Sequence, residues 1–299
     1  MSKRRFLVAM VLTLSATGCG QSVTSPTPAP TDTPIAVPTD PFTPGPMPSA
    51  PSAGETWTRP ADGMVMVYVP AGEFLMGATD ADSEAGEDEK PPHRVYLDGF
   101  WIDRTEVTNA QYRKCVEARA CREPWCWDES NFGYHDRFNA LDQPVVCVLW
   151  NNAHDYAAWV GGRLPTEAEW EKAARGTDGR KYPWGNEAPD CSKANYKDCV
   201  GGTTAVGSCP EGASPYGALD MAGNAWEWTT DKYGEDYYTH SPSHNPQGPD
   251  SGGFRVMRGG AFLGDPRNIR CTARYRGSPK YRPWWYGFRV VVPYTAPGP

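Results

Sequence analysis

Glycine and proline interrupt the chain along its whole length, with 31 glycines and 30 prolines among 299 residues. Proline removes a backbone donor and glycine costs conformational entropy, so long helices are not expected. The 12 tryptophans supply large side chains around which irregular segments can pack. We therefore expect an α+β domain with much irregular structure, in a chain long enough to bury its own core.

Apolar or alternating runs predict strands at 64–69, 73–77, 93–97 and 99–103. Thr108 and Thr166 each stand three residues before Gln or Glu, which is the capping-box spacing at the start of a helix. Asn151 can cap a third helix. The three helices are expected to end near residues 118, 175 and 159.

The first 18 residues have the pattern of a bacterial export signal. Basic residues 3–5 precede an apolar run at 7–16, which is too short to span a bilayer in the mature protein. Small residues then lead to Cys19, as in a lipobox, where cleavage precedes a cysteine that carries lipid. The alternative is an ordinary secretory signal with an incidental cysteine. We expect a signal peptide at 1–18, and a membrane anchor on Cys19 that holds the protein in the cell envelope, facing the periplasm or the exterior.

Residues 19–55 have the composition of a disordered tether, with ten prolines between Pro26 and Pro51. Such a segment forms an extended spacer of about 100 Å at roughly 3 Å per residue. One domain is expected after it, at 56–296. The net charge of −7 argues against nucleic acid as a partner, because a basic face is needed to displace counterions from phosphates.

Eight further cysteines favour disulfides, because their number is even and the protein is exported. Cys191 and Cys199 flank one short loop and are a reasonable pair, whereas the sequence does not assign the others. Cys121 and Cys126 have no matching Cys-x-x-Cys or histidine pair, so no zinc cluster is expected.

Seven motifs occur in order: MVMVYVPAGEFLMGA, PPHRVYLDGFWIDRTEVTNAQY, LPTEAEWEKAARG, YPWGN, YGALDMAGNAWEWT, RVMRGGAF and YGFRVV. Together they resemble the formylglycine-generating enzyme (sulfatase-modifying factor) family over residues 62–293. The resemblance implies a variant of the C-type lectin fold with little regular secondary structure. Enzymes of this family oxidise a sulfatase cysteine to formylglycine, using molecular oxygen and copper(I) held by two cysteines.

The positions that match the family's copper site lack its ligands. A cuprous ion requires soft thiolates, and residues 261–270 contain no cysteine. Gly264 stands where the first copper cysteine is expected, and Ala261 where the family has a serine that lines the oxygen pocket. The resemblance therefore implies that copper is not bound and that the chain is not a competent formylglycine oxidase.

Cys271 does not replace those ligands. By resemblance it matches a structural cysteine, and the position of that cysteine's disulfide partner is Ala174 here. Cys271 is therefore either bonded elsewhere, with Cys209 as one candidate, or buried and free.

The resemblance also implies calcium, which takes carboxylates and backbone carbonyls in flexible loops. The matching ligands are the side chains of Asp220 and Glu227 and the carbonyls of Gly223 and Ala225. A second, weaker site would use Asn195 and the Tyr196 carbonyl, with Asp198 as a weak guess for its acid. The alternative is a tight turn braced by tryptophans.

Arginine and aromatic residues interleave near the C-terminus, a mixture typical of binding surfaces. In the family this segment lies where substrate binds, and Trp226 matches a tryptophan of the substrate pocket. The alternative is that several of these side chains pack the core, and we expect about half to be exposed. The candidates are Trp226, Arg267, Arg270, Arg274, Tyr275, Arg282, Trp284 and Trp285.

The sequence thus favours a surface-tethered module that binds an envelope or extracellular protein, peptide or glycan. One alternative is an oxidoreductase with a rearranged metal site, acting on a protein cysteine or on another substrate. Another is an assembly factor that scaffolds a neighbouring envelope protein.

Overall fold

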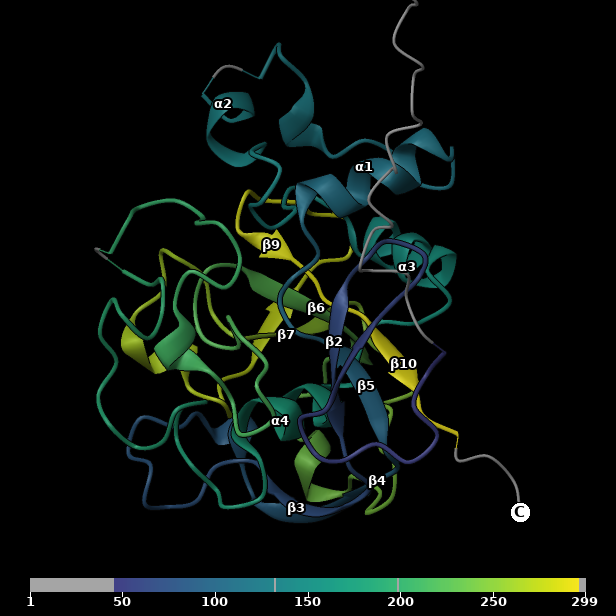
Figure 1. Ribbon diagram of the computed structural model, residues 1–299. Coiled ribbons are helices and arrows are strands. Elements are labelled where there is room, and N and C mark those ends of the chain that lie inside the picture. The colour runs from purple at the N-terminus through teal and green to yellow at the C-terminus, as the bar shows by residue number, and fades with distance from the viewer. Residues whose placement is uncertain (1–45, 132, 198, 296–299) are drawn as a thin grey trace, which may run out of the picture. The chain divides into compact units, whose positions relative to one another are not determined.

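Two four-stranded sheets and one two-stranded sheet frame the computed structural model, which describes residues 46–131, 133–197 and 199–295 (Figure 1). The first sheet is antiparallel, in the order β1-β2-β5-β10. Its strands are apolar where they face the core, and all of β5 is buried. Their bounds are β1 Thr56–Thr58, β2 Val65–Val69, β5 Phe100–Asp103 and β10 Val291–Pro293.

The second sheet has the order β8-β7-β6-β9, in which β6 pairs parallel with β9 and antiparallel with β7. Its edge strand β8 pairs only with β7. The bounds are β6 Trp226–Lys232, β7 Arg255–Arg258, β8 Tyr275–Gly277 and β9 Tyr286–Gly287. Strands β3 Gly72–Met76 and β4 His93–Leu97 form the antiparallel two-stranded sheet.

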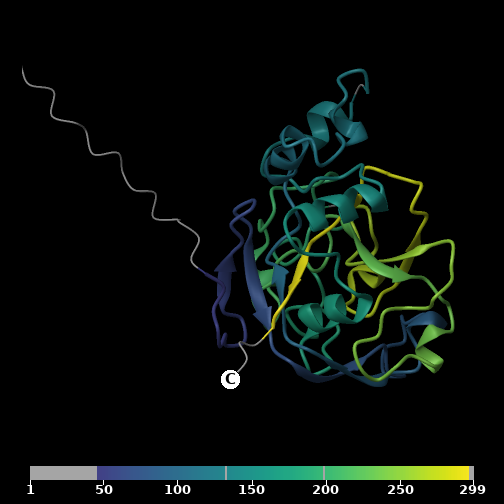
Figure 2. The ribbon, with the colours of Figure 1, turned by 90° about the vertical axis from the view of Figure 1, so that its right-hand side faces the viewer.

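Four short α-helices are described: α1 Asn109–Glu117, α2 His135–Phe138, α3 Trp150–Trp159 and α4 Glu167–Arg175. The segment that carries α1 and α2 projects from the end of the domain where β9 lies, far from β3 and β4 (Figure 1, Figure 2). Short 3₁₀ turns punctuate the loops, at Glu87–Glu89, Trp125–Trp127, Pro210–Gly212, Tyr237–Thr239 and Pro266–Ile269. The mixture of short helices, short strands and irregular loops confirms the predicted α+β class.

The capping predictions for α1 and α4 are confirmed. Thr108 accepts from the Gln111 backbone and Thr166 from the Glu169 backbone, and both helices have the reciprocal bond of a capping box. The prediction for α3 is wrong, because the helix begins one residue before Asn151. There the Asn152 side chain accepts from the Leu149 backbone at 3.1 Å, so Asn151 lies within the helix.

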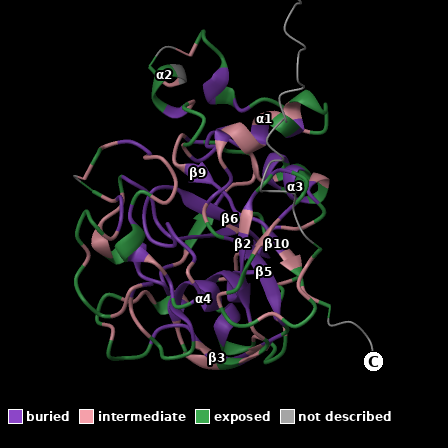
Figure 3. Ribbon diagram, viewed as in Figure 1, coloured by how far each residue is buried: buried purple, intermediate pink, exposed green. Residues whose placement is uncertain are grey.

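Helix α4 is charged in sequence yet buried along its whole length (Figure 3). Its charges are paired inside the domain. Glu171 accepts from Arg175 at 2.9 Å and from Arg258 at 2.6 Å. Lys172 donates to two backbone carbonyls of the β2–β3 turn. Because a buried charge is tolerated only when it is paired, these contacts fix α4 against β3 and β7.

The folded unit includes residues that the sequence analysis assigned to the tether. Gly54 N donates to Tyr68 O at 2.9 Å, and Tyr68 N donates to Glu55 O at 2.9 Å, so this end of the tether pairs with β2. The predicted signal peptide, Cys19 and the tether up to residue 45 lie outside the described residues. In the part that the structure describes, no helix is long and apolar enough to cross a membrane.

Three disulfides link described cysteines. The predicted Cys191–Cys199 bridge is confirmed. The other two bridges, which the sequence left unassigned, are Cys115–Cys121, which ties the last turns of α1 to the loop after it, and Cys126–Cys147, which packs in one core cluster with Phe138 of α2.

Candidate functional site

The loop at the family's copper position is a tight backbone turn. Gly264 N donates to Ala261 O at 2.7 Å, and the Ala261 side chain is buried. A Cβ added at Gly264 would lie 3.1 Å from Ala261 O. Within the described residues, no three His, Cys, Asp or Glu side chains gather in a way that could hold a metal ion by themselves.

The two remaining described cysteines are both free and buried, so the candidate pair Cys209–Cys271 does not form. Cys271 packs in the same core cluster as Ala174. Burial raises the pKa of Cys271 to about 12, so its sulfur is a neutral thiol at physiological pH. Burial also raises the pKa of Cys209. Neither sulfur therefore presents the thiolate that copper(I) requires.

Eight aromatic rings form one continuous chain of contacts beside β8 and β9. From one end, the successive centroid distances are 5.1, 6.4, 6.2, 4.6, 4.9 and 5.4 Å, and Tyr281 joins at 6.5 Å from Tyr286. We call this set the aromatic surface. Its residues, in contact order, are Trp226, Tyr275, Tyr286, Trp285, Trp284, Tyr134 and Trp125, with Tyr281 as a branch.

The aromatic surface is partly open to solvent. Among the described residues, seven large hydrophobic side chains are exposed, and Tyr281 (57%), Tyr275 (43%) and Trp125 (36%) all belong to this surface. Trp284 and Trp285 are half-buried, whereas Trp226 is buried beneath Tyr275. Because exposed apolar patches of this kind mark interaction sites, the surface is the leading candidate for ligand binding.

At one end of the aromatic surface lies a slot of about 310 Å³. Trp125, at the 3₁₀ turn before α2, lies on one side of the slot, and Trp284 and Pro283 line it from the segment before β9. Tyr134 contacts both tryptophan rings, at 5.4 and 4.9 Å. The remaining lining residues are Lys280, Tyr281 and Arg282.

Arg270 and Arg274 are not available to a ligand, although both were candidates. Arg270 donates to the Glu89 carboxylate at 2.6 and 2.8 Å and to Asp82 at 2.8 Å. Arg274 donates to Glu167 at 2.7 and 2.9 Å, with neither side chain open to solvent. These arginines neutralise buried carboxylates and are part of the core.

The exposed cations of the same segment have different surroundings. Lys280 and Arg282 make no ion pair or hydrogen bond with any described residue, and both are exposed. Arg276 lies over the rings of Tyr233 and Phe254, at 6.0 and 5.7 Å. The predicted candidate Arg267 is exposed too, but it lines a separate shallow cavity beside Glu84 and Asp265.

The calcium candidates lie in a buried acidic centre. Both oxygens of Glu227 accept from Arg289, at 2.6 and 2.7 Å, and one also accepts from Trp170 at 2.8 Å. Asp220 accepts from Gly207 N. Burial raises its pKa, although the bond from Gly207 N and the charge of Arg289 oppose that rise.

Glu106 is a member of this centre that the sequence analysis did not single out. One of its oxygens accepts from Asn224 at 3.0 Å, and the other is buried without a partner in the described structure. Burial and the charges of Asp220 and Glu227 hold its pKa well above the usual range. An orphaned carboxylate oxygen beside a second carboxylate has the donor chemistry that a calcium ion takes.

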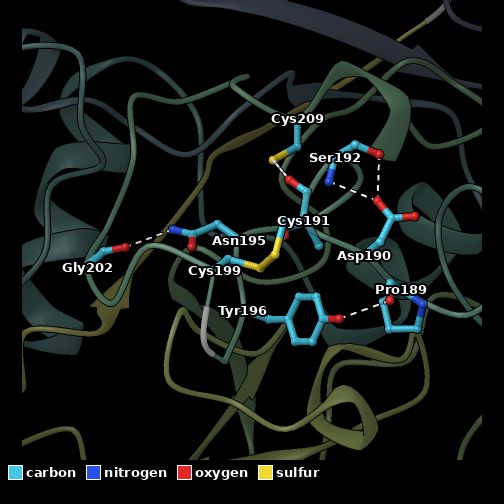
Figure 4. Close-up of a disulfide and its surroundings, with 10 residues drawn as sticks. Pro189, Asp190, Cys191, Ser192, Asn195, Tyr196, Cys199, Gly202 and Cys209 are labelled. Carbon is cyan, nitrogen blue, oxygen red and sulfur yellow. Dashed lines mark hydrogen bonds between the residues drawn. A yellow bond between two sulfur atoms is a disulfide. The ribbon is translucent and has the colours of Figure 1, made fainter.

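The second calcium candidate also has one unsatisfied oxygen. Asn195 donates to Gly202 O at 2.8 Å, while its own side-chain oxygen is buried without a partner (Figure 4). The Tyr196 hydroxyl donates to Pro189 O, and the Cys191–Cys199 bridge closes the loop. Cys209 donates to Cys191 O at 3.8 Å on the other side. Asp198, the guessed acid of this site, lies outside the described residues.

Comparisons with known proteins agree with the fold and the motifs. The model of the sulfatase-modifying factor enzyme 1-like domain matches residues 52–293. The formylglycine-generating enzyme of Streptomyces coelicolor is 32% identical, over 82% of this chain and 95% of that protein. The serine/threonine-protein kinase pkn1 of Chlamydia caviae is 40% identical, over 76% of this chain. The chain spans only 37% of that kinase's length.

Among solved structures, PvdO from Pseudomonas aeruginosa superposes with a TM-score of 0.70 and 28% identity, covering 81% of this chain and 99% of that one. Treponema denticola variable protein 1 shares the fold, with a TM-score of 0.62 at 23% identity, covering 79% of this chain and 98% of that one. The predicted resemblance is thus confirmed, and the chain belongs to the formylglycine-generating enzyme (sulfatase-modifying factor) family.

Proposed function

We propose that this protein is a tethered binding module of the family, which uses the aromatic surface to hold an envelope or extracellular protein, peptide or glycan. The observation that carries the proposal is the contrast between the two candidate sites. The copper position has Ala261 and Gly264 in place of ligands and no thiolate nearby. The aromatic surface instead exposes Trp125, Tyr275 and Tyr281 together.

Exposed tryptophan and tyrosine side chains suit binding, because their large rigid rings lose little conformational entropy on contact with a partner. Lipidation of Cys19 and a proline-rich spacer would carry this surface away from the membrane. The proposed location is therefore the cell envelope, with the domain facing the periplasm or the exterior.

Calcium is proposed as a structural ion of the domain. The carboxylates of Asp220 and Glu106 and the backbone carbonyls of Gly223 and Ala225 would hold it, with Glu227 already bound to Arg289. A bound calcium ion would neutralise the acidic centre and brace the loop between it and β6. The Asn195 amide oxygen and the Tyr196 carbonyl are a weaker candidate for a second ion.

The alternative function is an oxidoreductase that modifies a protein cysteine, or another substrate, at a rearranged site. Relatives support this class, because the hercynine oxygenase of Mycolicibacterium smegmatis is 32% identical over 78% of this chain. The missing thiolates argue against copper chemistry of the formylglycine type.

The full chain in mild detergent, incubated with copper(I), oxygen and a Cys-x-Pro-x-Arg peptide, separates the two functions. We expect no loss of the peptide thiol to an aldehyde by mass spectrometry, and no stoichiometric copper in the recovered protein. Formation of the aldehyde at several turnovers would overturn the binding-module proposal and establish the oxidase.

A further inference from the structure

The slot at the end of the aromatic surface differs in charge from the rest of the protein. The chain as a whole carries a net charge of −7, yet no acidic residue lines the slot. Its two charged members, Lys280 and Arg282, are both cations. Neither cation forms an ion pair with a carboxylate among the described residues. The lining of the slot is therefore positive, on a molecule that is acidic overall.

The positive charge is separate from the structural arginines of the same segment. Arg270 and Arg274 are neutralised by Glu89 and Glu167 inside the domain. Lys280 and Arg282 are held outside it, where their charges are free to meet a ligand. Within one short segment, Arg270 and Arg274 therefore stabilise the core, whereas Lys280 and Arg282 lie at the surface.

The rest of the lining is apolar. Trp125, Tyr281, Pro283 and Trp284 supply rings on several sides, and the volume of about 310 Å³ suits one large side chain of a partner. No Asn, Gln, Asp or Glu side chain lines the slot, so the hydroxyl groups of a neutral sugar would find the donors of Lys280 and Arg282 but no carboxylate or amide oxygen to accept from them. This favours an apolar anchor on a polypeptide.

The neighbouring backbone also suits a polypeptide. Strand β8, which contributes Tyr275 to the aromatic surface, is an edge strand of its sheet, and β7 is its only partner among the described strands. An extended peptide can add to such an edge through main-chain hydrogen bonds while one of its side chains enters a pocket. The aromatic rings between β8 and the slot connect the two features.

From this geometry we infer that the aromatic surface recognises an acidic polypeptide segment, in which a large apolar side chain fills the Trp125–Trp284 slot and flanking carboxylates meet Lys280 and Arg282. The inference rests on the proposed binding function and names its ligand class. Like-charged remote surfaces of the two partners would repel, so the local cations also orient the encounter. Binding is therefore expected to weaken as salt is raised.

The test uses the full chain in mild detergent and three fluorescent probes: a 12-residue peptide with one tryptophan flanked by Asp and Glu, the same peptide with Asn and Gln, and chondroitin sulfate. Fluorescence anisotropy gives the dissociation constants. We expect the acidic peptide to bind at least about tenfold more tightly than its neutral match, because charge-assisted hydrogen bonds are lost in the latter.

Variants locate the binding. Arg282→Glu is expected to weaken binding of the acidic peptide at least about tenfold. Arg94→Glu makes the same charge change at an exposed residue of β4, at the opposite end of the domain, and is expected to weaken binding less than about twofold. Trp125→Ala removes a side chain that is 36% exposed, so the variant is expected to keep its fold and to bind the acidic peptide about tenfold or more weakly. Circular dichroism on each variant checks that the fold is kept.

The outcomes separate the inference from the function beneath it. Equal binding of both peptides, with sensitivity to Trp125→Ala but not to Arg282→Glu, would overturn the acidic-ligand inference and leave the binding module standing. Tight binding of chondroitin sulfate alone would replace the polypeptide by an anionic glycan. Absence of binding by all three probes at millimolar concentration would count against the aromatic surface as a site for these ligands and against the inference.

Discussion

The buried acidic centre and the aromatic surface are both unbalanced in charge, but in opposite senses. In the acidic centre, Glu106, Asp220 and Glu227 share the single guanidinium of Arg289. On the aromatic surface, Lys280 and Arg282 have no carboxylate partner among the described residues. An imbalance in the interior has to be relieved by a proton or a bound cation, whereas an imbalance at the surface is tolerated in water.

The comparison explains how one fold can keep a scaffold and change its use. The charges that hold the core together are paired inside the domain, so removing one partner of such a pair is expected to cost stability. Exposed charges such as Lys280 and Arg282 form no ion pair with a described residue, so changing them is not expected to destabilise the fold. Function can therefore change at the aromatic surface while the acidic centre stays as it is.

The largest effect is expected for Arg289→Met. The substitution leaves Glu227 buried beside Glu106 and Asp220 without its cation, and breaking a buried pair in this way costs about 3–5 kcal/mol in the free energy of unfolding. Urea denaturation followed by tryptophan fluorescence measures it. The matched change Arg282→Met is expected to cost less than about 0.5 kcal/mol. Equal losses in the free energy of unfolding for Arg289→Met and Arg282→Met would show that the buried ion pair does not stabilise the fold more than the exposed cation does.

Calcium is expected to stabilise the wild-type chain by about 2.7 kcal/mol at a hundredfold excess over its dissociation constant. Glu106→Gln should abolish this gain, because the neutral amide replaces a carboxylate ligand. Chelator and calcium-loaded samples are compared by thermal melting. A calcium-dependent shift that survives in Glu106→Gln would place the ion elsewhere.

When calcium is absent, Glu106→Gln is expected not to lower the stability of the protein. Burial raises the pKa of Glu106, so its contribution to stability is full below its unfolded pKa of about 4.3 and is lost as pH rises toward the folded value. Glu106→Gln is therefore expected to be at least as stable as the wild type at pH 7 in the presence of chelator, and the two should converge near pH 4.

The pair Glu89–Arg270 should show the reverse pH dependence. Burial alone would raise the pKa of Glu89, but the hydrogen bonds and charge of Arg270 hold it below the usual range. Its stabilisation is thus present above about pH 4.3 and is lost as pH falls through the lower folded value. Arg270→Gln should lose about 2 kcal/mol at pH 7 and much less near pH 2. A loss that stays constant with pH would contradict the pairing.

The sequence predicted best where the determining contacts are local. The caps of α1 and α4 were found because each Thr and its partner lie three residues apart. The sequence offers Asn151 as the cap of α3, whereas Leu149 has that place and Asn152 accepts from its backbone, because only the backbone path decides where the helix begins. The Cys191–Cys199 bridge was likewise a short loop.

Contacts between residues that are far apart in the chain could not be predicted from the sequence. The sequence predicts Arg270 as a binding residue, because nothing local indicates that it pairs with Glu89, 181 positions away. Nothing in the sequence links Trp125 to the C-terminal aromatics, although it stands in a Trp-Cys-Trp run whose cysteine, Cys126, is bonded to Cys147 in the structure. Glu106 stands in a quoted motif, but only the fold brings it to Asp220.

The smallest effect concerns two arginines that lie over the same ring. Arg274 and Arg276 have guanidinium carbons 5.0 and 6.0 Å from the centre of Tyr233. Arg274 is also bound to Glu167 in the interior, whereas Arg276 is exposed and, in the part of the chain that the structure describes, has only its ring contacts. Arg276→Ala is therefore expected to cost about 0.5 kcal/mol, the value of an exposed cation–π contact, against about 3 kcal/mol or more for Arg274→Ala. Urea denaturation of both variants gives the ratio, and a cost for Arg276→Ala close to that for Arg274→Ala would mean that exposure does not separate the two sets of arginines.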